Sequence, residues 1–468
     1  MNLESRIRNH RARARRVVAC ALVCLAFTGT AAAQQRPATL STLFEDIFGP
    51  RGLVLNSDDV QLDGTNHAAH FNSAFQSEFR LMNVALTSQL ATVPLPSPAS
   101  GFTYTFDSAT GTFVRSTRSF GPILTDRGET IGRGRIAFGY TYQFFSYDHL
   151  DGVSLAAVPA VFTHDDREAG GGRADVVATS NTIEATVSQL TGALTYGVSD
   201  RIDLSLAVPV VRTRLALLSN ATIHRIGTGN NLAVHYFRDA DSIGGYGSTR
   251  QFFAEGSAAG VGDLVARAKA TLLREGSRAL AVGVDLRLPT GDEQNLLGSG
   301  AMGVRPFAAL SASLGPLAPH ANVAYQWNGK STLAGSSADV PLQEHDDHST
   351  TMRLQQQKGD LPDQFSYALG ADLLVASRLS VVFDLFGQRV VNSPRLVSRL
   401  STLSGVAGSV TLPNIQFETE SYWTSAAGFG LKGNIASRML VTFNLRFAVA
   451  DGGLTDRLSP LVGVEWAF

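Results

Sequence analysis

Cysteine is nearly absent from this chain of 468 residues. Its two cysteines, Cys20 and Cys24, both lie within the first 33 residues. That stretch begins with basic residues, continues with an apolar run and ends with small residues, which is the pattern of a secretory signal peptide. We expect cleavage after Ala33. The exported chain would then carry no thiol, which excludes a disulfide framework and thiolate chemistry.

Charge and long apolar runs are also scarce. Charged residues make up 17% of the chain and the formal net charge is −1 at pH 7, so we expect no nucleic-acid partner. Beyond the N-terminal stretch, no apolar run approaches the ~20 residues that a membrane helix needs. These shortages exclude a bundle of membrane helices. They leave an exported chain that is rich in glycine, with 45 residues of this type.

What the sequence does contain is alternation. Between Ile136 and Phe144, every second residue is large and apolar, and small or polar residues stand between them. The same pattern recurs in 201–210, 280–288 and 439–449. A period of two residues indicates a β-strand whose two faces differ, one apolar and one polar.

Twelve such segments follow one another, and their connections alternate between short turns and longer loops. This pattern is typical of outer-membrane barrels, which have short periplasmic turns and long outer loops. A closed barrel also leaves no backbone group unpaired in lipid. We therefore predict an all-β fold, a monomeric transmembrane antiparallel β-barrel over 133–468, in the outer membrane of a Gram-negative bacterium. The expected strands are 133–146, 183–197, 201–222, 260–274, 278–290, 303–314, 318–330, 363–375, 379–392, 418–433, 437–449 and 458–468.

The sequence ends on an aromatic residue within the last alternating segment. Trp466 and Phe468 share the apolar face of that segment, so we place both in the aromatic girdle at the periplasmic interface. A terminal aromatic also resembles the signal that outer-membrane barrels present to their assembly machinery. We expect Trp466 and Phe468 to act as that signal. The expected partners are outer-membrane lipid, lipopolysaccharide and the barrel-assembly machinery.

Residues 34–132 do not follow the alternating pattern. Apolar residues from Phe71 to Leu90 recur at steps of three and four, which indicates an amphipathic helix, and 101–116 has the pattern of a hairpin. Two interpretations stay open for this segment, a periplasmic cap on the barrel and a plug inside it.

Charged residues fall on the polar faces of the expected strands. They can pair with one another and neutralise a wet interior, or they can form the lining of a polar pore with a mild basic bias. The numbers of positive and negative residues on these faces are nearly equal, which favours internal pairing. The expected lining residues are Arg135, Arg201, Asp203, Asp263, Arg267, Lys269, Asp285, Arg287, Asp384, Arg438 and Arg446.

No motif in the chain indicates enzymatic chemistry. The glycine pattern in 428–433 leads into another strand, whereas a phosphate site requires a helix there. The cluster His345, Asp346, Asp347 and His348 has the side chains of a divalent metal site, but we favour a solvated loop. We expect no catalytic residue, no cofactor and no metal.

Three stretches resemble an outer-membrane transporter family of the meta-pathway of phenol degradation, which is similar in turn to the long-chain fatty-acid channel superfamily. They are "GVGDLVARAKATLL" (260–273), "LAVGVDLRLPTGDEQNLLGSG" (280–300) and "SRLSVVFDLFGQ" (377–388). The resemblance implies a channel for uptake of small hydrophobic or aromatic molecules by facilitated diffusion. The alternatives are a general polar porin and a structural, adhesive or enzymatic barrel.

The motif "LPTGDEQNLLGSG" places two leucines in a loop that should be exposed. If this loop folds inward, Leu296 and Leu297 would offer an apolar contact at the mouth of the channel; the alternative is burial against neighbouring loops. An apolar path could continue along the stripe of the N-terminal segment, since ligand sites are mostly apolar. The candidate substrate contacts are Leu296, Leu297, Phe71, Phe75, Phe79 and Met82.

Overall fold

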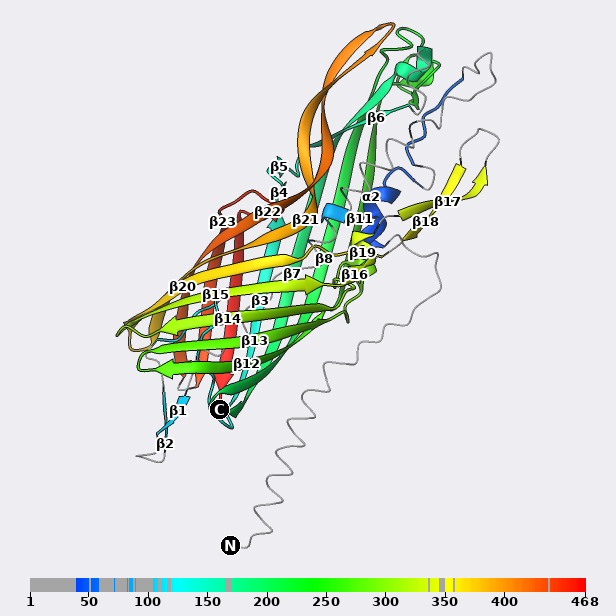
Figure 1. Ribbon diagram of the computed structural model, residues 1–468. Coiled ribbons are helices and arrows are strands. Elements are labelled where there is room, and N and C mark those ends of the chain that lie inside the picture. Colours follow the sequence, from blue (N-terminus) through cyan, green and yellow to red (C-terminus); the bar gives the residue numbers. More distant parts are fainter. Residues whose placement is uncertain are drawn as a thin grey trace. The chain divides into compact units, whose positions relative to one another are not determined.

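Twelve antiparallel strands form a closed barrel in the computed structural model (Figure 1). The structure describes residues 39–49, 52–58, 71, 82, 84–86, 89, 104–107, 112–115, 119–164, 171–335, 337–344, 350–356, 358–436 and 438–468. Among these residues, no helix is long and apolar enough to cross a membrane.

The barrel closes where its last strand pairs with its first, with Leu461 opposite Gln143 and Ala467 opposite Ala137. Each strand overlaps one of the twelve segments expected from alternation, so the predicted fold class is confirmed. The strands, in chain order, are β3 (Ile136–Tyr147), β7 (Val176–Ser199), β8 (Ile202–His224), β12 (Leu264–Glu275), β13 (Arg278–Leu288), β14 (Gly303–Ala312), β15 (Leu317–Asn328), β20 (Gln364–Ala376), β21 (Leu379–Gly405), β22 (Gly408–Ala436), β23 (Met439–Ala448) and β25 (Leu458–Ala467).

The wall has an apolar exterior and a polar interior, as period two requires. Along β8, Ile202 and Leu204 are 43% and 48% exposed, whereas Asp203 between them is 2% exposed. Because the exposed side chains of the wall are aliphatic and aromatic, they suit lipid, and this construction is that of an outer-membrane barrel. Further outward residues of this kind are Leu194, Val284, Leu310, Val323, Leu369, Phe383, Phe443 and Val462.

Four strands continue well beyond the barrel at the long-loop end. β21 and β22 form one hairpin up to Gly405 and Gly408, drawn in orange in Figure 1. The expectation of a loop over 393–417 is therefore wrong. This part of the hairpin carries polar cross-strand pairs, including an ion pair between Arg399 and Glu418. Its apolar residues Leu396 and Ile415 are buried in the core at the long-loop end, so it does not show the regular apolar alternation of a lipid-facing strand.

β7 and β8 also extend at the long-loop end, and each gains a partner there. β6 (Val158–Thr163) pairs with β7, and β11 (Thr249–Val261) pairs with the upper part of β8. β11 leads into β12 through Gly262 and Asp263, so the two behave as one strand with a break. Below the break β12 pairs with β13, but β11 has no pairing on that side among the described strands.

Short elements complete the loops and the described parts of the N-terminal segment. The expected hairpin within 101–116 is confirmed by the pairing of β1 with β2. These elements are η2 (Leu40–Thr42), α2 (Leu43–Asp46), β1 (Tyr104–Asp107), β2 (Thr112–Arg115), β4 (His149–Leu150), β5 (Val153–Ser154), η5 (Gly171–Ala174), β9 (Phe237–Arg238), η6 (Ile243–Gly245), β10 (Tyr246–Gly247), η7 (Glu293–Asn295), β16 (Lys330–Ser331), η8 (Thr332–Ala334), β17 (Ser337–Glu344), β18 (Thr350–Gln356), β19 (Gly359–Asp360) and β24 (Leu454–Thr455).

The main apolar core lies at the long-loop end. There, Leu40, Phe44 and Phe71 of the N-terminal segment pack in one cluster with residues of the barrel and its loops, among them Phe145 and Leu296. The isolated bridge between Asn56 and Tyr236 ties the same segment to the loop after β8. The described residues from 39 to 58 thus contact the long-loop end, whereas 119–132 contact the interior near the short turns. The division of the chain at residue 132 stays a prediction.

At the short-turn end, the two C-terminal aromatics lie beside the first strand. The ring of Trp466 stacks on that of Phe138 with centroids 6.1 Å apart, and Phe468 is 55% exposed. The amide nitrogen of Phe468 donates to the carbonyl oxygen of Ile136 at 2.8 Å. Both residues therefore belong to the closing seam of the barrel. Their role as an assembly signal stays a prediction.

Candidate binding chamber in the barrel lumen

Residues 119–132 cross the lumen near the short turns and form a floor. Their backbone amides donate to inward-facing carboxylates: Gly121 to Asp372 at 3.2 Å, and Leu124 to Asp384 at 3.2 Å. Every residue of this floor segment except Leu124, Pro122 included, is buried. Because a buried carboxylate is costly unless hydrogen bonds satisfy it, the floor and the charged wall depend on each other.

Arg267 is the strongest link between the wall and the floor. Its guanidinium makes two hydrogen bonds to Asp285 at 2.6 and 2.8 Å, and a third to Asp126 of the floor segment at 2.7 Å. The carbon of the guanidinium also lies 4.6 Å from the ring centroid of Phe307. A planar fork with five donors suits such bidentate pairing. This arrangement is the internal pairing that the balance of charges favoured.

Other charges pair in the same way. Lys269 lies 3.7 Å from Asp203 and donates to the carbonyl oxygen of Glu129 at 2.7 Å. His320 contacts Asp372 at 2.5 Å, and Lys432 lies 3.7 Å from Glu465. The near-neutral interior is therefore built from pairs and not from a continuous charged stripe.

The loop 289–302 folds inward and closes the break between β11 and β12. Thr290 accepts from the amide of Leu264 and donates to the carbonyl oxygen of Gly262, at 3.0 and 2.8 Å. Asp263 accepts from Gly291 at 3.1 Å and from the amide and hydroxyl of Ser299 at 2.8 and 2.5 Å. The motif that carried the family resemblance thus has a structural purpose, because its polar residues fasten this loop to the strand break.

Asp292 and Leu296 shape the loop itself. Asp292 caps η7 by accepting from Gln294 and Asn295, and Leu296 adopts a left-handed conformation with φ of 56°. The carbonyl oxygen of Leu296 accepts from the Thr213 hydroxyl at 3.1 Å. The turn directs both leucines inward, since Leu296 is fully buried and Leu297 is 7% exposed.

Glycine at position 262 makes this closure possible. A Cβ there would lie 2.9 Å from the carbonyl oxygen of Leu297, 3.0 Å from the side chain of Val211 and 3.1 Å from that of Pro209. An apolar strip therefore converges on the strand break. We call Pro209, Val211, Val265 and Leu297 the apolar strip.

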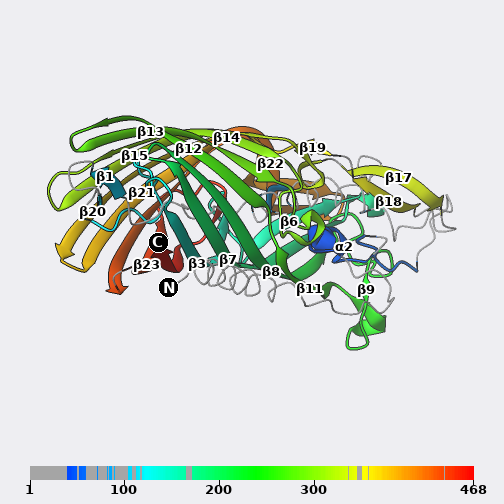
Figure 2. The same cartoon turned by 90° about the horizontal axis from the view of Figure 1, so that it is seen from below.

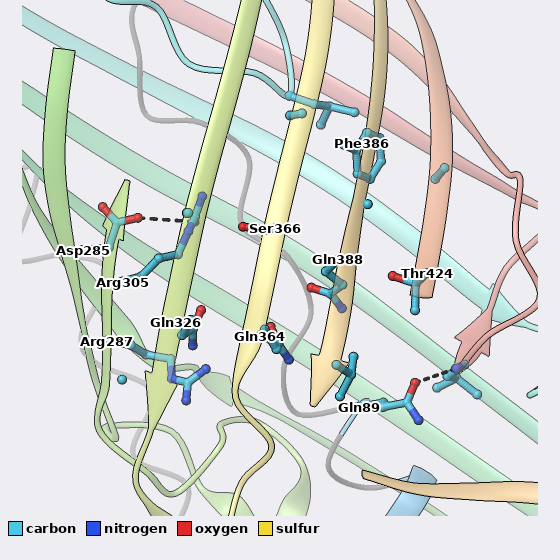
Figure 3. Close-up of a pocket in the computed structure, with 18 of the residues that line it drawn as sticks. Gln89, Asp285, Arg287, Arg305, Gln326, Gln364, Ser366, Phe386, Gln388 and Thr424 are labelled. Carbon is cyan, nitrogen blue, oxygen red and sulfur yellow. Dashed lines mark hydrogen bonds and ion pairs between the residues drawn. The ribbon is translucent and has the colours of Figure 1, made fainter. Parts of the chain in front are cut away.

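Between the floor and the loops lies a chamber of about 360 Å³. Leu124 and Asp126 line it from the floor, and Gln89 and Leu454 line it from the long-loop end. Figure 3 shows polar side chains of several neighbouring strands along its wall. The chamber is amphipathic, because the apolar strip lines one side and guanidinium and amide groups line another. The amide-bearing wall residues are Gln143, Gln189, Asn322, Gln326, Asn328, Gln364 and Gln388.

The predicted lining residues divide into three groups. Asp263, Arg267, Asp285, Arg287 and Arg446 line the chamber. Asp203, Lys269 and Asp384 lie buried against the floor segment instead. Arg135, Arg201 and Arg438 lie at the short turns, where Arg201 and Arg438 are exposed, and they do not line the chamber. Their assignment to a conducting path stays a prediction.

Arg305 and the glutamines were missed by sequence reasoning. Arg305 is the one charged residue of the expected strand 303–314, and alternation alone does not rank it among the charges of the barrel. Gln326, Gln364 and Gln388 are inward residues near the same end of three consecutive strands. A search for polar residues at matching heights on neighbouring strands would have found this row.

The candidate substrate contacts occupy two places. Leu296 and Leu297 line the chamber, and Phe71 and Met82 are fully buried in the core at the long-loop end. Phe75 and Phe79 lie outside the described residues. The cluster His345, Asp346, Asp347 and His348 also lies outside them.

Another buried carboxylate, Asp175, organises the loops at the long-loop end. It accepts from the amides of Gly227 and Thr228 at 2.8 and 3.0 Å, and Nδ1 of His235 lies 2.9 Å away. Burial raises the pKa of Asp175, but the hydrogen bonds from His235, Thr228 and Gly227 outweigh it and hold the pKa below its ordinary value. Asp175 is therefore an anion that fastens two loop segments to each other.

Comparison with known proteins agrees with the sequence resemblance. Residues 160–348 match the family model described as "Putative MetA-pathway of phenol degradation". Two of the three stretches that suggested this family, 260–273 and 280–300, fall inside that range, so the resemblance is confirmed there. A comparison with curated protein sequences finds no match.

Solved structures of outer-membrane barrels are also similar to this chain. An outer-membrane channel from Pseudomonas putida F1 is 14% identical, covers 73% of this chain and 97% of its own, and has a TM-score of 0.39. A FadL homologue of Pseudomonas aeruginosa is 12% identical over 71% of this chain and 89% of its own, with a TM-score of 0.28. The CymD monoaromatic hydrocarbon channel is 11% identical over 72% and 89%, with a TM-score of 0.29. At these identities the likeness concerns barrel architecture alone.

Proposed function

We propose that this protein is an outer-membrane channel of a Gram-negative bacterium that takes up small hydrophobic or aromatic molecules by facilitated diffusion. The observation that carries the proposal is the amphipathic chamber enclosed between the floor segment and the loop 289–302. A chamber of about 360 Å³ lies within the range of small-molecule sites, which is roughly 300–1,000 Å³. The family match at 160–348 supports the same class of function.

A general polar porin is the alternative that the polar wall favours. Such a porin needs a continuous water path, and sixteen or more strands usually provide it. Here, residues 119–132 cross a lumen of twelve strands and are hydrogen-bonded to several of them. The floor segment lies between the chamber and the short turns, so we expect it to move before a solute leaves the chamber there. This requirement favours selective uptake over general diffusion.

Uptake of toluene by intact cells tests the proposal, because lipopolysaccharide slows the entry of apolar solutes that no channel admits. Cells that produce the protein should accumulate radiolabelled toluene faster than cells that lack it. Leu297→Asn should slow this uptake several-fold, since it places an amide on the apolar strip where burial without partners costs ~1–3 kcal/mol.

The matched control is Leu400→Asn on the extended hairpin, where the native side chain is 75% exposed. It should take up toluene as the wild type does. Folded barrel in the outer membrane is measured for each variant by its shift on unheated gels. Equal toluene uptake with and without the protein would reject the channel for hydrophobic molecules, and a large open conductance in planar bilayers would favour the porin.

A further inference from the structure

Two arginines of the chamber keep donors that its acidic residues do not use. The Nε–H groups of Arg287 and Arg305 are buried and have no hydrogen-bond partner among the described residues. Arg287 also donates through a terminal nitrogen to the side-chain oxygen of Asn328 at 2.8 Å. The side chain of Arg305 is 35% exposed to solvent, whereas that of Arg267, which makes three hydrogen bonds to carboxylates, is 8% exposed. Figure 3 shows both side chains beside the cavity, on the side that carries Gln326.

The nearby carboxylates are already committed elsewhere. Asp285 makes close bonds of 2.6 and 2.8 Å to Arg267, and its contact with Arg305 is longer at 3.3 Å. Asp263 binds the loop 289–302 through three hydrogen bonds, and Arg287 lies 3.8 Å from it. Asp285 is therefore bound mainly to Arg267, and Asp263 is bound mainly to the loop 289–302. The guanidinium groups of Arg287 and Arg305 keep hydrogen-bond donors that an anion could use.

The two arginines are placed to share one ligand. Arg287 is opposite Gly303 in the register, and Arg305 follows Gly303 by two residues on the same inward face. Residues two apart on a strand are separated by about 7 Å, a span that two long side chains can bridge around a carboxylate. A Cβ at Gly303 would lie 3.2 Å from a guanidinium nitrogen of Arg287 and 3.1 Å from the amide nitrogen of Gln326, so glycine leaves room where these donors converge.

An apolar surface adjoins these donors directly. Val265 is opposite Arg287 in the register and opposite Ala207 on its other side. The apolar strip continues from there through Pro209 and Val211 to Leu297, whose contacts around the strand break are described above. A flat ring can therefore lie on the strip while its charged group points to the arginines.

We propose that the chamber binds aromatic carboxylates, with the carboxylate held between Arg287 and Arg305 and the ring on the apolar strip. This inference rests on the proposed function and narrows it from hydrophobic aromatics to aromatic acids. Guanidinium forks recognise carboxylates through paired hydrogen bonds that are stronger than neutral ones. Gln326 and Gln364 then supply amide donors on the same wall.

Isothermal titration of the purified full-length protein in detergent tests this site with three probes. Benzoate carries both the ring and the charge, benzyl alcohol keeps the ring alone, and acetate keeps the charge alone. Benzoate should bind at least about ten-fold more tightly than either of the others, since a charge-assisted hydrogen bond alone accounts for a factor of that size. Benzyl alcohol or acetate binding as tightly as benzoate would overturn the proposal, and this comparison needs no variant.

Variants locate the site. Arg305→Gln and Arg287→Gln should each weaken benzoate binding about ten-fold and change benzyl alcohol binding less than about two-fold. Arg399→Gln is the matched control, because that arginine pairs with Glu418 on the extended hairpin and is 56% exposed. Undiminished benzoate binding by folded Arg305→Gln and Arg287→Gln would overturn the proposed site.

Toluene uptake separates failure of this inference from failure of the proposed function. If cells producing the protein accumulate toluene normally but the protein does not prefer benzoate, the inference fails and the channel for hydrophobic molecules stands. If the protein binds benzoate through the arginines but does not speed toluene uptake, the inference stands and the function must be restated for acidic aromatics.

Discussion

The two ends of the lumen are closed by different physics. At the short turns, the floor segment is held by backbone amides and buried ion pairs, with Arg267 joined to Asp126 and Asp285. At the long loops, closure depends on apolar packing, in which Phe71 and Leu296 are fully buried. The chamber lies between a polar closure and an apolar one.

The two kinds of closure should differ in the molecules that can pass them. Apolar packing is non-directional, and a ring can replace a leucine side chain at little cost because both surfaces are dry. Hydrogen bonds between buried charged groups are directional, and separating such groups without a replacement partner costs several kcal/mol of free energy. An apolar molecule can therefore enter past the long-loop side, whereas release at the short turns requires water or a polar group to replace the bonds of the floor. We therefore expect selection at the long-loop end and retention at the short turns.

The largest expected effect comes from breaking the polar closure at its centre. Arg267→Met should lower the free energy of unfolding by about 3–5 kcal/mol, because it leaves Asp126 and Asp285 buried with fewer partners. The contact of Arg305 with Asp285 at 3.3 Å places the expected loss at the lower end of that range. Denaturant titration of the barrel in lipid vesicles measures it.

Removing the charges of Asp126 and Asp285 tests whether the loss of stability comes from unpaired buried carboxylates. Adding Asp126→Asn and Asp285→Asn to Arg267→Met should recover part of the lost free energy, since the buried charges are gone. Arg399→Gln breaks an ion pair with both side chains exposed, at 56% and 39%, and should cost no more than about 1 kcal/mol. Equal losses for Arg267→Met and Arg399→Gln would mean that the floor is not held by buried pairing.

An intermediate effect, on single-channel conductance, is expected when the segment that closes each end of the lumen is removed. Replacing 119–132 with a Gly-Ser segment of equal length should raise single-channel conductance several-fold, because the polar lumen near the short turns becomes open to water. Removing 39–58 should raise it much less, since the floor stays bonded in place. Planar bilayer recordings on both variants decide the matter. A larger increase from the second variant would reverse the roles of the two ends.

The barrel was predictable because lipid imposes alternation on every strand. Outward residues such as Leu204 must be apolar, and a residue such as Asp203 beside it then points inward, so a local pattern reveals each strand. The extended hairpin beyond Val390 was missed because its sequence lacks regular apolar alternation. Its cross-strand pairs are mixed, with Thr402 opposite Thr411 and Leu403 opposite Val410.

The chamber was only partly predictable for a related reason. Alternation identifies inward residues but not their heights, and the roles of Arg287 and Arg305 depend on which carboxylates reach them. Sequence separation also hid the floor, since Asp126 lies 141 residues from its partner Arg267. The apolar nature of Leu296 and Leu297 raised an inward fold of their loop as one of two alternatives, the other being burial against neighbouring loops. The strand break that they close was not visible in the sequence.

The smallest expected effect concerns Asp175, a charged anchor of the loops at the apolar end. Asp175 has a pKa below its ordinary value, so the anion contributes stability that is present above the unfolded pKa of about 3.9. That contribution is lost as the pH falls through the lower folded value. The amides of Gly227 and Thr228, which donate to Asp175, should therefore stay protected from hydrogen exchange down to about pH 4.

Asp175→Asn should weaken that protection at pH 7 by about 1–2 kcal/mol, because bonds to a charged acceptor become bonds to a neutral one. The variant should then show little further change in acid, once intrinsic exchange rates are divided out. His235 and Arg225 also face this carboxylate. Loss of wild-type protection already near pH 6 would mean that the Asp175 anion is not what holds these amides. In that case the apolar end would open under mildly acidic conditions, and its closure could not be assigned to packing alone.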